Sequence, residues 1–163
     1  MKIKILYLFF AITLFSSCSK EDKVISLKEN IHHDDFEYSV QSVEKSDSIA
    51  AVKAKGTFYI VTFRVENKAK RVNHEWENSI AYIVDKDGKE YENSNELQND
   101  LAKIKLFVPK VKHNTPAGET ESALLVFDIP NDVKEPFLKV RGSFLMGDMF
   151  DGNRFKNTKV KLF

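Results

Sequence analysis

The sequence predicts an all-β protein, an antiparallel immunoglobulin-like (telokin-like) β-sandwich with one short helix. Two observations indicate this fold. From Phe36 onward, short apolar runs with a period of two alternate with turn residues, as strands with one buried face do. About seven or eight such runs follow one another, which suits a sandwich of this type. The sequence has one cysteine, so it lacks the disulfide of antibody domains and its core must be held by packing.

The central strand is predicted at 56–67, with the sequence GTFYIVTFRVEN. One face of this strand, with Phe58, Ile60, Thr62 and Arg64, changes from apolar to charged toward its end, as expected where a strand leaves a core. The alternation that begins at Phe36 predicts an earlier strand of the same kind. The wholly apolar face of the central strand, which we expect in the core, consists of Tyr59, Val61, Phe63 and Val65.

The remaining elements follow from turn and capping residues. Asp87-Gly88, after the apolar run 80–84, predicts a hairpin because both residues tolerate positive φ. Segment 93–104 is the helix candidate, with Asn93 as its N-cap and apolar residues at helical spacing. We expect this helix to be a decoration on the sandwich. Further apolar runs, some ended by proline, lie at 106–108, 121–130, 137–140 and 159–163.

Residues 1–17 have the pattern of a signal peptide. Two lysines precede an apolar run at 5–15, which is too short to cross a bilayer, and two serines then precede Cys18. A disulfide is excluded because there is no second cysteine, and a catalytic thiol would need a folded, electropositive pocket. Lipid attachment needs only the signal peptide and small residues before the thiol.

The stretch LFSSC at 14–18 resembles a bacterial lipobox, with Phe15 where an aliphatic residue is usual. The resemblance implies that Cys18 becomes the first residue of the mature lipoprotein and carries diacylglyceryl and further acyl chains, such as palmitate. Two or three chains give firm membrane anchoring. Simple secretion with an unmodified Cys18 is the alternative.

The mature chain divides into a polar tether at 18–33 and a sandwich domain at 34–163. Fully extended, the tether would span at most ~50 Å. The segment Ser19–Asp22 resembles the short tag of lysine and acidic residues that sends some lipoproteins to the cell surface. A plain solvated tether is the alternative interpretation, and the two are compatible.

Several stretches resemble a known family: DDFEYSVQSVEK (34–45), the central strand, YIVDKDGKEYE (82–92) and PAGETESALLVFDIP (116–130) followed by FLKV. They are similar to bacterial telokin-like, immunoglobulin-like domains of unknown function, found in secreted proteins and lipoproteins. This group is related in fold to a secreted immunoprotective antigen. The resemblance implies the fold and supplies no catalytic residues. The segment 143–155 departs from the pattern by being longer and more aromatic.

The run of His32, His33, Asp34 and Asp35 is the weak candidate for a metal site. Imidazole and carboxylate suit zinc, but neighbours in an extended chain point to opposite sides, so about half of them could share one ion. His74 and His113 would have to complete the set. A hydrated entry to the first strand is the favoured interpretation. No cofactor is predicted.

Two features fit binding better than catalysis. The tail segment 143–155 would be a partner patch if exposed, although folding onto the sandwich is the simpler expectation. Trp76, the one tryptophan, is either a binding residue or, as we favour, a core residue at one end of the sandwich. The tail residues that would bind are Phe144, Met146, Met149 and Phe150.

The sequence therefore predicts a noncatalytic binding or interaction module, lipid-anchored to the outer membrane of a bacterial cell envelope. It either faces the cell exterior or serves as a periplasm-facing structural accessory of an envelope complex; a metal-dependent enzyme is the third interpretation. A protein or a glycan is the expected ligand. A net charge of +1 gives no bias toward nucleic acid. No P-loop, dinucleotide or nucleophile-elbow motif occurs.

Overall fold

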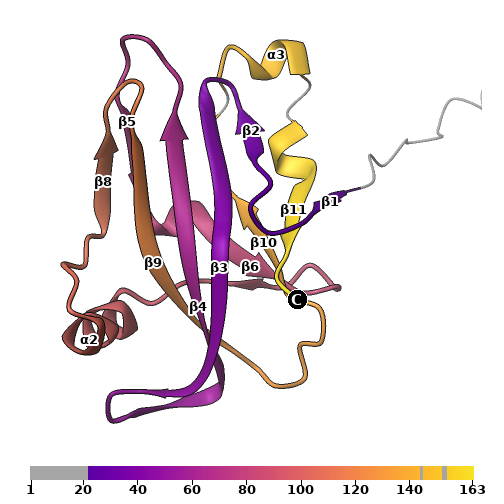
Figure 1. The fold of residues 1–163 in the computed structure, drawn as a ribbon. Coiled ribbons are helices and arrows are strands. Elements are labelled where there is room, and N and C mark those ends of the chain that lie inside the picture. Colours follow the sequence, from indigo (N-terminus) through magenta and orange to yellow (C-terminus); the bar gives the residue numbers. More distant parts are fainter. Residues whose placement is uncertain (1–21, 144, 152–153) are drawn as a thin grey trace, which may run out of the picture.

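The computed structural model describes residues 22–143, 145–151 and 154–163, which form a sandwich of β-sheets (Figure 1). One sheet has the strand order β1-β11-β10-β6-β7, a second has the order β2-β3-β4-β9, and β5 and β8 form a separate pair. The strands are β1 (Lys23–Ile25), β2 (Ile31–His33), β3 (Phe36–Ile49), β4 (Val52–Asn67), β5 (His74–Glu77), β6 (Ala81–Val84), β7 (Glu90–Tyr91), β8 (Lys112–Thr115), β9 (Thr120–Ile129), β10 (Phe137–Val140) and β11 (Thr158–Lys161).

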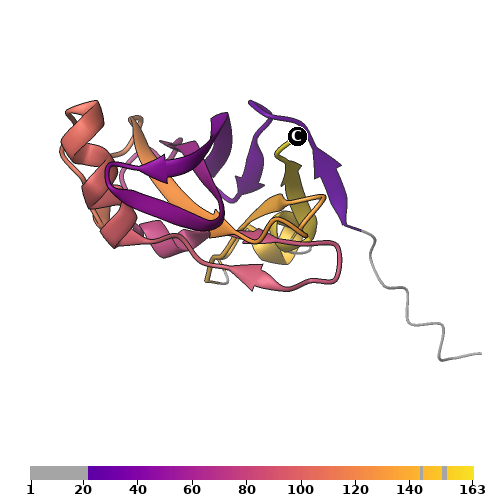
Figure 2. The same ribbon diagram turned by 90° about the horizontal axis from the view of Figure 1, so that it is seen from below.

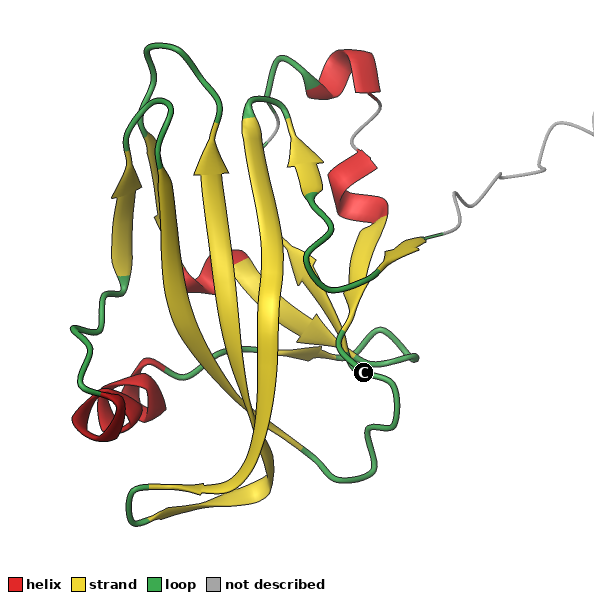
Figure 3. Cartoon of the chain, viewed as in Figure 1, coloured by secondary structure: helices red, strands yellow, loops and turns green. Residues whose placement is uncertain are grey.

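Helical elements are few, and Figure 3 shows how strands dominate the described chain. Helix α2 spans Asn95–Lys105, and α3 is a single turn at Asp148–Asp151. The 3₁₀ turns η2 and η3 span Asn78–Ile80 and Arg154–Asn157. The strand pairs within the sheets are antiparallel except for β1, which runs parallel to β11. The predicted sandwich fold is confirmed.

The core lies between the two larger sheets, and the predicted face of β4 enters it. Tyr59, Val61, Phe63 and Val65 all belong to the main cluster of buried side chains. The opposing sheet contributes Ile83, Leu138 and Val160, which are fully buried. At ~25 cal/mol per Å² of apolar surface removed from water, this layer is the main source of stability for a chain with one cysteine.

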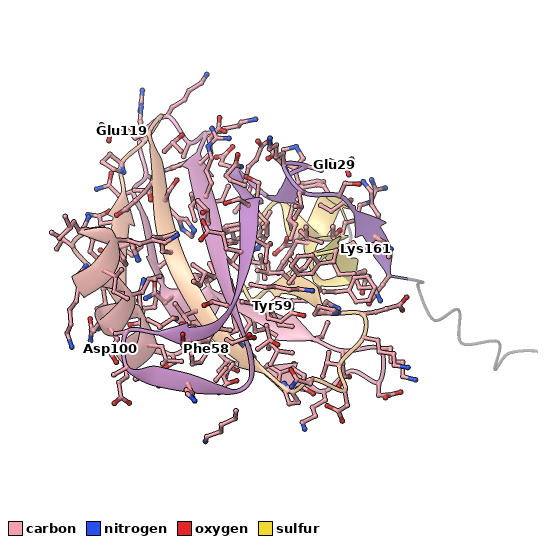
Figure 4. All side chains as sticks on the ribbon, turned by 60° about the horizontal axis from the view of Figure 1, so that its bottom comes forward. Glu29, Phe58, Tyr59, Asp100, Glu119 and Lys161 are labelled. Carbon is pink, nitrogen blue, oxygen red and sulfur yellow. The ribbon has the colours of Figure 1, made fainter. Side chains whose placement is uncertain are left out.

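Helix α2 covers the other face of β4, so it is more than a decoration. Phe58 and Ile60 point away from the main core and pack with Leu101 of α2 and Val126 of β9 in a second cluster. In Figure 4, Phe58 lies toward α2 and Tyr59 lies toward the other sheet. The charged end of that face, beyond Thr62, is left uncovered, which explains why the apolar pattern ends there.

Turn and capping residues predicted the hairpin and the helix, and the predicted bounds of the helix are within two residues of those in the structure. The hairpin at Asp87-Gly88 joins β6 to β7, and Gly88 has φ of +82°. The N-cap of α2 is Ser94, whose hydroxyl accepts from the Leu97 amide. Asn93, the predicted cap, instead donates to the carbonyls of Asn78 and Ala81. The apolar run at 106–108 is a loop after α2 in which Leu106 and Val108 are exposed and Phe107 packs against the second cluster.

The domain begins about eleven residues earlier than the predicted start at residue 34, because two strands precede it. β1 pairs with β11, and β2 pairs with the start of β3. Asp22 is already tied to the domain by ion pairs of 3.5 Å to Lys139 and 3.4 Å to Lys159. The predicted polar tether at 18–33 is therefore corrected: residues 22–33 belong to the sandwich. Cys18 and most of the predicted surface tag lie outside the described residues. Within the described part of the chain, no helix is long and apolar enough to cross a membrane.

Candidate interaction surfaces

A buried histidine–carboxylate pair attaches the C-terminal segment to the sandwich. Nε2 of His33, at the end of β2, donates to Oδ2 of Asp148, at the start of α3, over 3.2 Å. The His33 and Asp148 side chains are 3% and 0% exposed. The same Asp148 oxygen accepts from the Leu145 amide at 2.7 Å, which caps the single turn of α3. The pair therefore links two segments that are 115 residues apart in sequence.

Close packing around His33 supports this attachment. The His33 ring stacks on Phe155 of η3 with 3.7 Å between ring centroids. Gly142 passes so near that a β-carbon there would lie 2.4 Å from Cε1 of His33, so glycine is required at this position. On the other side of the β2–β3 turn, Oδ2 of Asp34 accepts from the Gly147 amide at 3.3 Å. The expectation that segment 143–155 folds onto the sandwich holds for Asp148 and Phe155.

A second histidine lies in the same region. The Tyr38 hydroxyl is 2.9 Å from Nε2 of His74, and the Phe36 ring stacks on the His74 ring at 3.8 Å. Burial and, to a smaller extent, the nearby His33 together lower the pKa of His74 to about 4. Burial also raises the pKa of Tyr38, and Asp148 adds to this effect. His74 is therefore neutral at pH 7 and accepts the hydrogen bond from Tyr38.

The attached segment leaves three large apolar side chains in solvent. Met146, Met149 and Phe150 are 77%, 71% and 88% exposed. Met149 and Phe150 lie in α3, and Met146 lies just before it, where its carbonyl accepts from the Met149 amide at 3.2 Å. We call these three residues the C-terminal patch. Phe144, also predicted to bind, lies outside the described residues.

A second exposed apolar surface follows α2, and the sequence pattern did not predict its exposure. Leu106 and Val108 are 89% and 83% exposed, and Ile104 and Val111 are partly exposed. We call these four residues the α2–β8 patch. Leu106 ends the helix in the left-handed conformation, with φ of 52° and ψ of 51°, a strained choice for a leucine. Lysines at 103, 105, 110 and 112 are interleaved with the apolar residues, and that alternation is the signal that this run is not wholly buried.

A groove of about 210 Å³ adjoins the α2–β8 patch. Phe107, Val108 and Leu124 supply its apolar lining, and Lys110 and Glu121 lie at its polar side, joined by an ion pair of 2.9 Å. Burial would raise the pKa of Glu121, but hydrogen bonds from His113 and Lys110 outweigh it and lower that pKa. The charged side chains beside the groove are thus already paired with each other. The surface that remains for a partner is apolar.

Trp76 belongs to the core, as the favoured interpretation holds. It is 5% exposed and stacks on His113 at 3.8 Å with an angle of 7° between the rings. Its Nε1 donates to the Thr115 hydroxyl at 2.9 Å. His113 contacts Glu121 and Asn78 through its two ring nitrogens at 2.9 and 3.0 Å. These contacts fasten the β5–β8 pair to β9.

The predicted metal candidates do not converge. His32 is exposed and lies 3.3 Å from Glu37, whereas His33 turns inward to Asp148. Asp34 bonds the Gly147 amide, and Asp35 is exposed. His113 is held at Trp76, away from this run. Among the described residues, no three histidine, cysteine, aspartate or glutamate side chains are grouped as a metal ion would require.

With this geometry described, comparison with known proteins gives the family. A family model described as a domain of unknown function (DUF4352) matches residues 25–150. The chain belongs to this family. The match begins within β1, in agreement with the earlier start of the domain, and it confirms the predicted resemblance to a family of unknown function. No curated protein matches the chain.

Solved structures with the same fold come from several bacteria. The yjhA protein of Bacillus subtilis is 15% identical with a TM-score of 0.56, covering 85% of this chain and 98% of its own. A conserved hypothetical protein of Bacillus anthracis is 12% identical with a TM-score of 0.59, covering 85% and 94%. The secreted protein MPT63 of Mycobacterium tuberculosis is 14% identical with a TM-score of 0.53, covering 77% and 94%. At these identities the likeness shows the fold.

Proposed function

We propose that this DUF4352 protein is a lipid-anchored protein of the cell envelope whose sandwich is a noncatalytic interaction module. The signal-peptide pattern at 1–17 and the lipobox-like LFSSC at 14–18 support the anchor at Cys18. The structure supports an interaction role through the α2–β8 patch. Large apolar side chains held in solvent on a rigid scaffold usually mark a surface for a partner.

The position of this patch is the observation that carries the proposal. In Figures 1 and 2, β1, the first strand of the described chain, lies on the side of the domain opposite α2. A domain anchored through the residues that precede β1 presents α2 and the residues after it away from its attachment point. Leu106, at 89% exposed in a strained conformation, lies at the centre of the surface that would meet the partner.

The chemistry of the α2–β8 patch favours a protein partner over a glycan. Its exposed residues are aliphatic, and the lysines at 105 and 110 are paired with Glu44 and Glu121 at 2.6 and 2.9 Å. Sugar rings are commonly bound by stacking on exposed aromatic rings with free polar groups beside them. Aliphatic side chains with a charge-paired rim suit the apolar core of a protein interface.

A site-specific photo-crosslinker tests the patch in intact cells. Placed at position 106, it should give a discrete adduct, and the additional change Val108→Asp should abolish that adduct. The matched control is position 72, where Val72 is 60% exposed but lies outside the patch. Equal adducts from positions 106 and 72, or none from 106, would contradict an interaction at this patch.

Protease shaving of intact cells separates the two orientations of the anchored domain. Loss of the domain while a periplasmic control protein survives would place it on the cell exterior, and its partner would then be sought in the environment. Survival until the outer membrane is broken would support the second candidate, a periplasm-facing accessory of an envelope complex. The short distance between Cys18 and the folded domain keeps the domain near the membrane in either orientation, so protease access decides between the two candidates.

A further inference from the structure

We infer that the C-terminal patch, Met146, Met149 and Phe150, inserts into the interfacial region of the bilayer to which Cys18 is attached. The inference rests on the proposed lipid anchor and adds a second membrane contact to it. Two contacts would fix which side of the domain faces the membrane. The α2–β8 patch would then be held facing away from it.

The reach of the N-terminal chain is the first step. Lys23, the first residue of β1, follows Cys18 by five positions in the sequence, and five residue steps span at most ~17 Å. Asp22 is already ion-paired with Lys139 and Lys159, which shortens the free length further. The edge of the sandwich at β1 therefore lies close to the bilayer surface, and the domain cannot stand off on a long tether.

The second step is that the C-terminal patch belongs to the same part of the domain. Lys23 of β1 is the register partner of Thr158, the first residue of β11. Phe150 precedes Thr158 by eight residues, so the two lie at most ~28 Å apart. Between them, η3 connects back to Thr158, whose hydroxyl donates to the Arg154 carbonyl at 2.9 Å. A modest tilt of the domain about its anchor brings the patch to the membrane.

The third step is the chemistry of the patch. Exposed methionine and phenylalanine side chains that lie close together in sequence are suited to the headgroup–acyl boundary of a bilayer. Arg154 and Lys156 follow in η3 and are exposed, in position to meet anionic headgroups. Asp34 lies beside Gly147, however, so the apolar side chains and not net charge must supply most of the attraction. The contact between the patch and the bilayer should accordingly depend only weakly on salt concentration.

The fourth step is that the patch is already formed. Asp148 caps the α3 turn through the Leu145 amide and is held by His33 beneath it. The three apolar side chains therefore need little ordering on insertion, which preserves more of the free energy gained by their burial.

A nitroxide label measures where the patch lies. Full-length lipidated protein is incorporated in vesicles of phosphatidylethanolamine and phosphatidylglycerol at a ratio of about 3:1. Labels are attached at Phe150→Cys or Leu106→Cys, two positions that are 88% and 89% exposed in the free domain. Acylated Cys18 has no free thiol, so each variant carries one label. Collision with oxygen and with a water-soluble nickel chelate reports the depth of each label.

We expect the label at 150 to be shielded from the nickel chelate and accessible to oxygen, and the label at 106 to show the reverse. Doubling the salt concentration should change neither result much. A label at 150 as accessible to the chelate as the label at 106 would overturn the inference. Spin–spin broadening at 150 that grows with protein density would overturn it in favour of contact with a second copy.

Flotation and intact mass distinguish this failure from failure of the anchor. Protein that carries acyl chains and floats with vesicles, but has an aqueous label at 150, contradicts the membrane contact and leaves the anchor standing. Protein purified from the membrane fraction or the medium without acyl chains contradicts the anchor, and the inference falls with it. Cys18→Ser is the control that should neither be acylated nor float.

Discussion

Oδ2 of Asp148 lies 3.2 Å from Nε2 of His33, and this buried contact fixes the C-terminal segment on the sandwich. In the described part of the chain, the remaining polar atoms of the two side chains, Nδ1 of His33 and Oδ1 of Asp148, are buried and have no hydrogen-bond partner. Each member of the pair therefore depends on the other, and the exposed C-terminal patch depends on both.

Asp148→Ala should lower the free energy of unfolding by about 3 kcal/mol, because it leaves a buried histidine without its carboxylate and removes the cap of α3. Urea unfolding measures the change. The matched control is Asp100→Ala, which removes an exposed ion pair with Lys103 and should change stability by less than ~1 kcal/mol. Equal effects of the two substitutions would show that the Asp148 contact does not hold the fold.

Gly142→Ala should loosen the same segment without altering a charged group. The added β-carbon would lie 2.4 Å from Cε1 of His33, so the ring must move and stability should fall by about 1–3 kcal/mol. Amide hydrogen exchange should rise across residues 145–157. Gly88→Ala is the control: no atom lies within 4 Å of its added β-carbon, so only the strain of φ at +82° is introduced, and exchange at 145–157 should be unchanged.

Trp76→Ala should lower the free energy of unfolding by about 3–5 kcal/mol, because the indole is buried, stacked on His113 and hydrogen-bonded to Thr115. Thermal and urea unfolding test this directly. Val72→Ala, in the loop before β5, removes exposed atoms and should change stability by no more than ~0.5 kcal/mol. A Trp76→Ala protein of nearly normal stability would return Trp76 to the list of binding residues.

Stability should fall as the pH drops from about 6.5 to about 4 through His74. The folded protein keeps this ring neutral with a pKa of about 4, whereas the unfolded chain takes up a proton near the ordinary value of 6.5. The unfolded state thus binds more protons in this window. Because His74 is only half-buried, solvent screens part of this effect. We expect the free energy of unfolding to fall by an amount on the order of 1–2 kcal/mol.

Comparison with His74→Gln isolates this effect from the titration of carboxylates. Glutamine retains an acceptor for the Tyr38 hydroxyl but does not titrate. Urea unfolding at pH 7 and pH 4.5 should therefore show a smaller drop for the variant than for the natural protein. An identical drop in both proteins would exclude His74 as the source.

Local patterns were sufficient to predict the strands that build the core. The alternation in β4 correctly assigned Tyr59 and Val61 to one buried face, because that assignment depends only on the period of a strand. The same pattern showed Phe58 and Ile60 as apolar on the opposite face, but it contained no information on what covers them. The cover comes from α2, which is distant in sequence.

Contacts between distant segments could not be predicted from the sequence. His33 was noted as a possible metal ligand because its neighbours are ligand types, yet its partner is Asp148, 115 residues away. The short strands β1 and β2 also escaped detection, since three-residue strands have no readable period. The exposure of Leu106 depends on how α2 ends, and its left-handed conformation is unusual for leucine.

Mass spectrometry of the N-terminal peptide, from full-length protein purified out of the membrane fraction, tests the central claim most directly. The anchored-module account predicts a mature chain that begins at Cys18, with a thioether-linked diacylglyceryl group and further acyl mass that Cys18→Ser abolishes. A chain recovered in soluble form with an unmodified thiol at Cys18, or cleaved at another residue, would contradict it.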